Sequence, residues 1–214
     1  MTKENTLIEA HHTTTDLNVG DLQRHEWNKA QPVPIDRYWS GDAAPASRHC
    51  EARILWSSKA LHVRFVCNQA EPVIVSATPQ IAKKTMGLWD RDVCEIFIAP
   101  DAGVVERYFE FEAAPTGEWL DVAIHWTPEK RESDWEFQSH MTTAAQVERD
   151  RITIGMRIPW NHWIHEPHRN EHWRVNLFRC VVIDPGRGYL TWQPTRTKEA
   201  NFHVPQVFGS LVFK

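Results

Sequence analysis

A chain of 214 residues is long enough to bury a large core in one domain, and its 42% hydrophobic and 24% charged residues are typical of a globular protein. Its net charge of −4 leaves no basic footprint, which argues against a nucleic-acid partner. No apolar run approaches the roughly 18 residues of a membrane-spanning segment, so we expect no membrane partner.

The first 26 residues are polar and lack periodicity, so we interpret 1–26 as a polar leader that is either mobile or a strand wrapped along the domain edge. They contain no apolar run of the kind found in signal peptides, which predicts a cytoplasmic location. Secretion is the alternative if the chain is a trimmed precursor. We expect one domain over 27–214.

From Trp27 onward apolar residues alternate with polar ones, which indicates strands rather than helices. The segment "PWNHWIHE" allows at most one helical turn. We therefore predict an all-β fold, an antiparallel two-sheet β-sandwich. The expected strands cover 50–56, 60–67, 92–99, 107–113, 118–126, 151–159, 173–182, 189–194 and 208–213.

The segment "SSKA" between the first two strands predicts a hairpin closed by Ser57 and Ala60. Its register pairs residues that share one face: Trp56 with Leu61, Ile54 with Val63, Ala52 with Phe65 and Cys50 with Cys67. The other cysteines, Cys94 and Cys180, are widely spaced, and no two cysteines have the spacing of a metal-ligand pair. All four are expected to be reduced core thiols.

The stretch "GLWDRDVCEIFIAP" (87–100) places a carboxylate inside a strand that otherwise looks buried. If Cys94, Ile96 and Ile98 face the core, Glu95 faces outward, because strand side chains alternate. The same parity turns Glu110 and Glu112 outward on the next strand. We expect the three glutamates to share the outer face of one sheet.

Several patterns have both a functional and a structural interpretation. Trp89 and Trp192 could stack on a sugar while Glu95 binds its hydroxyls, or all three could be packing and ion-pairing residues. Glu95 and Glu110 could form the carboxylate pair of a glycoside hydrolase, although two glutamates on one face are more often solvated.

The other patterns concern metal ions. The histidine-rich loop (His162, His165, His168, His172) is interpreted as polar rather than metal-binding. Turn carboxylates (Asp90, Asp92, Asp101) leave calcium open, but turn capping is favoured. We predict no cofactor and no metal.

Taken in order, the segments "LHVRFVC", "LWDRDVCEIFIAP", "RYFEFEAAPTGEWLD", "GMRIPW", "WRVNLFRC", "LTWQPT" and "FHVPQVFGSLVF" resemble the family 9 carbohydrate-binding modules. The resemblance runs from about Trp27 to the end of the chain. It implies a jelly-roll-like sandwich that holds a sugar between two tryptophans, with a glutamate bonded to the hydroxyls.

Within that resemblance, Trp89 and Glu95 match the first half of the sugar site, and Trp192 is the candidate for the second tryptophan. Arg174 and Asn176 would supply polar groups at its edge. One departure stands out. Sugar-binding members can carry a basic and an amide residue two apart on the strand after the glutamate strand, where this chain has Glu110-Phe111-Glu112.

The expected function is thus non-catalytic binding of a saccharide or polyol, with a carbohydrate-active enzyme as a candidate partner. Two alternatives stay open. One is a hydrolase that uses Glu95 and Glu110. The other is a degenerate module that acts as an accessory or interaction subunit, for which a Trp89 packed against its own loops, with no open cleft, would be the sign.

Overall fold

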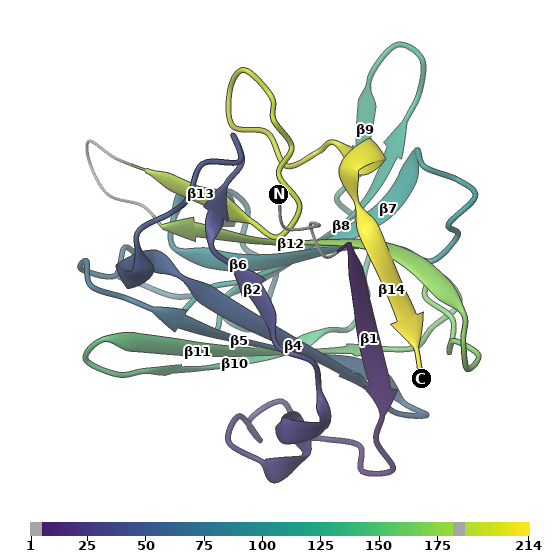
Figure 1. Ribbon diagram of the computed structural model, residues 1–214, viewed down its shortest axis with the longest axis horizontal. Coiled ribbons are helices and arrows are strands. Elements are labelled where there is room, and N and C mark those ends of the chain that lie inside the picture. The colour runs from purple at the N-terminus through teal and green to yellow at the C-terminus, as the bar shows by residue number, and fades with distance from the viewer. Residues whose placement is uncertain (1–5, 182–186) are drawn as a thin grey trace.

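The computed structural model describes residues 6–181 and 187–214 (Figure 1). Its strands are β1 (Leu7–His12), β2 (Val33–Ile35), β3 (Arg37–Tyr38), β4 (Cys50–Trp56), β5 (Ala60–Asn68), β6 (Val93–Ala99), β7 (Arg107–Ala113), β8 (Trp119–Trp126), β9 (Arg131–Asp134), β10 (Thr142–Val147), β11 (Arg151–Pro159), β12 (His172–Val181), β13 (Gly188–Thr191) and β14 (Gly209–Phe213).

Helical structure in these described ranges is limited to four short 3₁₀ segments, η1 (His25–Lys29), η2 (Ala46–Arg48), η3 (Leu88–Asp90) and η4 (Pro205–Val207). None of the described helices has the length and apolar character needed to cross a bilayer. The prediction of an all-β chain is confirmed.

The strands pair in one continuous path, β10-β11-β5-β4-β1-β14-β12-β6-β7-β8-β9. Apolar side chains from β4 and β5 share one core cluster with apolar side chains from β6 and β12, so the two halves of the path pack on each other as the layers of a sandwich. Figure 1 shows β11, β5 and β4 in one layer and β12, β6 and β8 in the other.

The strand β1 joins the two halves, and it pairs in parallel on both sides. Its first part lies along β14, with Leu7 opposite Ser210, and its last part lies along β4, with His12 opposite Trp56. The sheet is therefore mixed, which differs from the prediction of a wholly antiparallel sandwich. Every other pairing between the described strands is antiparallel.

Part of the polar leader expected over 1–26 forms a strand, as one of the two interpretations allowed, but this strand lies within the sheet rather than along the domain edge. Within 7–26, β1 is part of the sheet and buries Ile8 and Ala10, while Leu17 packs with Trp27 in a small separate cluster. Residues 1–5 lie outside the described ranges.

All nine expected strands form, and the hairpin register is confirmed pair by pair, including Cys50 opposite Cys67. The hairpin closes with the Ser57 amide donating to the Ala60 carbonyl at 3.0 Å. Val182, expected to end the strand at 173–182, lies outside the described ranges. All four cysteines are buried free thiols.

Strand parity in β6 and β7 is as predicted. Cys94, Ile96 and Ile98 belong to the core between the layers, whereas Phe97 belongs to a second apolar cluster on the outer face. Phe97 and Phe202 of that second cluster also line a cleft on the outer face.

Candidate functional site

A cleft of about 370 Å³ opens on the outer face of β6 and β7. Its volume lies within the range of small-molecule sites. Its lining comes from β6 and β7, from η3, from the strands β9, β12 and β13, and from loops. The lining residues are Trp89, Asp90, Glu95, Phe97, Glu110, Arg131, Ser133, Trp135, Cys180, Arg187, Tyr189, Ala200, Asn201, Phe202 and His203.

Trp89 reaches this cleft because of the turn that carries it. Gly87 has a left-handed backbone (φ 72°), which glycine adopts without strain, and it starts the 3₁₀ turn η3. Leu88 anchors the turn, fully buried in the outer apolar cluster, and Trp89 remains 37% exposed. An anchored turn thus presents an open indole face to solvent.

The neighbouring tryptophan in the cleft is Trp135, which follows β9 and is also 37% exposed. The two ring centroids are 6.1 Å apart, and the ring planes are tilted by 34°. A sugar held between parallel rings would need about 7–8 Å, twice an ordinary carbon–carbon contact. The two indoles therefore contact each other and form one tilted aromatic wall.

The inner part of the cleft is acidic. Glu95 is directly opposite Glu112 across β6 and β7, and Glu110 is opposite Phe97. Carboxylate oxygens of the three glutamates all lie within 4.8 Å of one another. As predicted, they share the outer face of the sheet, but the surrounding loops bury all three.

Burial raises the pKa of each carboxyl group in this cluster, because the charged form loses its hydration. The pKa of Glu110 rises to about 7. Burial and the neighbouring glutamates raise the pKa values of Glu95 and Glu112 well above the ordinary value. At neutral pH the cluster retains protons, so it offers hydrogen-bond donors as well as acceptors.

Basic and aromatic groups lie beside the acids. The Arg187 guanidinium stacks 4.6 Å from the Tyr189 ring centroid, and its Nε and Nη2 have no hydrogen-bond partner among the described residues. Burial and the charge of Arg131 lower the pKa of His203 to about 3, so its imidazole is neutral. The His203 Nδ1 lies 2.9 Å from the Tyr108 hydroxyl.

The structure brings Trp89, Glu95 and Glu110 to one cleft but does not bring Trp192 there. Trp192 is only 8% exposed and belongs to the core between the layers. Its ring covers Gly209 so closely that a Cβ there would collide with it. The expected pairing of Trp192 with Trp89 is therefore wrong, because Trp192 has the same parity as the core residue Leu190.

The two polar edge candidates also lie outside the cleft. The buried Asn176 accepts hydrogen bonds from the amides of Leu177 (2.9 Å) and Gln193 (3.0 Å), so it fixes the chain after β13. The Arg174 guanidinium donates from Nη2 to the carbonyl of Pro205. Both side chains hold loops in place.

The metal-binding alternatives can be placed as well. Asp101 Oδ1 accepts from the Gly103 amide at 3.0 Å, and Asp92 Oδ2 accepts from the Ile74 amide at 3.1 Å. Both act as loop or turn caps. In the histidine-rich loop, His165 pairs with Glu171 at 2.6 Å.

Sequence reasoning missed Trp135 and Tyr189. The triplet Arg131, Ser133 and Trp135 has a period of two and lines the cleft, so its alternation was the available signal. For Tyr189 the signal was parity, since it is the neighbour of the inward-facing Leu190.

Comparison with known proteins adds to this geometry. The family model described as "Carbohydrate family 9 binding domain-like" matches residues 20–214. No curated protein sequence matches the chain.

Solved structures share the fold at low sequence identity. A candidate carbohydrate-binding protein from Bacteroides uniformis matches with a TM-score of 0.76 at 16% identity, over 97% of this chain and 99% of that one. A family 9 carbohydrate-binding module from Caldicellulosiruptor kristjanssonii in complex with cellotriose matches with a TM-score of 0.68 at 13% identity, over 97% and 93%. The same organism's module in complex with glucose gives 0.68 at 14%, over 97% and 95%.

Proposed function

Because the chain belongs to the carbohydrate family 9 binding domain-like family, we propose that it is a non-catalytic module that binds a saccharide in the Trp89–Trp135 cleft. The observation that carries the proposal is the joint position of two half-exposed indoles and buried carboxyl groups in one cleft. A pyranose has apolar C–H faces and a rim of hydroxyls, and this cleft offers a surface for each.

The sugar stacks on the tilted wall from one side rather than between two rings. This geometry follows from the 6.1 Å separation of the indoles, which leaves no room for a sugar between them. Glu95 and Glu110 then accept from or donate to hydroxyls. The Nε and Nη2 groups of Arg187, which have no hydrogen-bond partner in the described part of the chain, supply further donors at the edge.

Binding accounts for the carboxyl groups better than hydrolysis does. A glycoside hydrolase needs one protonated and one ionised carboxyl group, placed on either side of the scissile bond. Here the pKa values of all three glutamates are raised together, and the three groups lie side by side on one sheet face. Trp89 does contact Trp135, but it also borders an open cleft, which argues against a degenerate module.

Calorimetric titration with glucose, cello-oligosaccharides and a panel of other sugars tests the proposal. Trp89→Ala and Trp135→Ala should each weaken binding by about 10–100-fold, because stacking and associated contacts supply roughly 1–3 kcal/mol per aromatic anchor. Trp163→Ala is the matched control, since Trp163 is exposed but lines a different cavity beside His165.

Unchanged affinity in both cleft variants, or an equal loss in the control, would refute the site. Release of new reducing ends by the wild-type chain, abolished in Glu110→Gln, would establish the hydrolase instead.

A further inference from the structure

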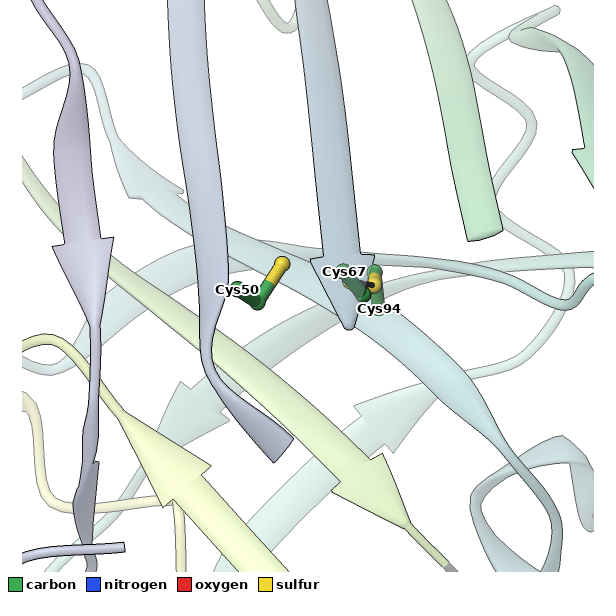
Figure 2. A group of neighbouring side chains, drawn as sticks. All are labelled: Cys50, Cys67 and Cys94. Atoms are coloured by element: carbon green, nitrogen blue, oxygen red, sulfur yellow. Dashed lines mark hydrogen bonds between the residues drawn. The ribbon is translucent and has the colours of Figure 1, made fainter. Parts of the chain in front are cut away.

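Three of the four cysteines come together in the core, far from each other in sequence. Cys50 on β4 and Cys67 on β5 are register partners, and Cys94 comes from β6 in the opposite layer. Figure 2 shows the Cys50 sulfur directed toward the Cys67–Cys94 pair. All three are buried free thiols, and the cluster therefore spans the two layers of the sandwich.

The sulfur positions suit a single thiolate-bound metal ion. The Cys67 and Cys94 Sγ atoms are 3.5 Å apart, and the three sulfurs lie within 4.8 Å of one another. Zinc–sulfur bonds of about 2.3 Å place the sulfurs of a tetrahedral site about 3.8 Å apart. Shifts of a few tenths of an ångström to about one ångström would complete that geometry.

The electrostatic surroundings also match a divalent ion. The buried Arg179 carries a positive charge next to the cluster, and its guanidinium is held by the carbonyls of Arg48 (2.6 Å) and Asn68 (2.7 Å). The charges of one divalent ion and one guanidinium offset those of three thiolates, and the Asp92 carboxyl group lies beside them. A monovalent ion would leave one more negative charge uncompensated in the core, which is unfavourable at low dielectric constant.

A fourth ligand has a place beside the sulfurs. A cavity of about 10 Å³ is lined by Cys67, Cys94, Asp92, Gln69 and Arg179, among others. This is about the space that one water molecule occupies. Three thiolates and one water would give zinc its usual four-coordinate shell.

We propose that Cys50, Cys67 and Cys94 bind one Zn²⁺ ion, which joins the two layers of the sandwich. Thiolates are soft ligands that select zinc over calcium or magnesium. When all three cysteines start as thiols, binding forms three zinc–sulfur bonds and releases three protons to solvent. The three cysteines do not line the sugar cleft, and the role of the site is structural.

The test is to refold the full chain from urea under a reductant, with one equivalent of Zn²⁺ or Co²⁺. We expect one metal per chain by native mass spectrometry and a thiolate-to-cobalt charge-transfer band. Zinc at about a hundredfold over its Kd should raise Tm by roughly 5–10 °C. Cys67→Ala should lose the band and weaken zinc binding by about 100-fold or more.

Val63→Ala is the matched control, because Val63 is equally buried on the same strand as Cys67 but does not line the cavity beside the sulfurs, and it should keep the band. Folding of each variant is checked by circular dichroism. The wild-type measurements stand even if a variant fails to fold. The proposal would be overturned if the refolded, reduced wild-type protein bound no metal in the presence of Zn²⁺ or Co²⁺. A cobalt band that persists in Cys67→Ala would also overturn it.

Discussion

Replacing Glu110 with glutamine should remove a pH-dependent loss of stability from the carboxyl cluster. Burial raises the pKa of Glu110 from 4.5 to about 7, so between these values the folded protein holds a proton that the unfolded chain has lost. Because the folded state binds more protons, the free energy of unfolding falls as pH rises. Each pH unit across this interval costs about 1.4 kcal/mol, or about 3 kcal/mol in total.

Glutamine resembles the neutral acid in shape and hydrogen bonding but does not ionise. Glu110→Gln should therefore match the wild type near pH 4.5 and exceed it by about 3 kcal/mol at pH 8. Urea denaturation at half-unit steps from pH 4.5 to 8.5 measures the difference. Glu129→Gln, at an exposed position away from the cluster, is the control. Parallel wild-type and Glu110→Gln curves across this range would refute the reasoning.

Two further changes test other parts of the structure by the same assay. Trp192→Ala should lower the free energy of unfolding by about 3–5 kcal/mol, because it empties part of the core. Trp89→Ala should change the free energy of unfolding by less than about 1 kcal/mol. Similar losses in the two variants would contradict the distinction between a core and a cleft tryptophan. Glu171→Gln should show the opposite pH dependence to Glu110→Gln. Burial opposes ionisation of Glu171, but hydrogen bonds from the His168 amide and the Trp173 indole outweigh it and lower the pKa. Its stabilisation is present above about pH 4.5 and is lost as pH falls through the lowered pKa. The variant should therefore be less stable than the wild type at pH 7, and the difference should shrink as the solution is acidified below pH 4.5. A difference that stays constant on acidification would argue against this origin.

The strands that could be predicted are those whose apolar side chains alternate over seven or more residues, such as β5 and β11, or that flank clear turns. The strands β9 (Arg131–Asp134) and β10 (Thr142–Val147) were not predicted, because none of their side chains is buried and they form by pairing with neighbours, although Arg131, Ser133 and Trp135 do alternate. For a related reason, a strand over the first residues was only one of two interpretations of the leader. Only Ile8 and Ala10 mark the buried face of β1.

In the candidate site, too, features set by local alternation could be predicted, whereas features set by long-range contacts could not. Parity placed Glu95 and Glu110 on the correct face, because alternation along a strand is a local property. The partner of Trp89 depends on where β9 docks, which is a long-range property, so Trp135 was missed and Trp192 was chosen in its place. Parity also could not show that loops cover the glutamates, and this cover is the cause of their raised pKa values.

The double pairing of β1 has a consequence for how the chain reaches its folded state. Leu7 pairs with Ser210 and Ala10 with Phe213, so the start of the domain is completed by its last strand. Contacts between such distant residues must close a very long loop, and folds rich in them form slowly. On the ribosome, β1 can find β4 early but must wait for β14 until the domain has fully emerged. The pairing between β1 and β14 is therefore expected to form last, after synthesis. Until then, the backbone groups of β1 that face β14 stay unpaired.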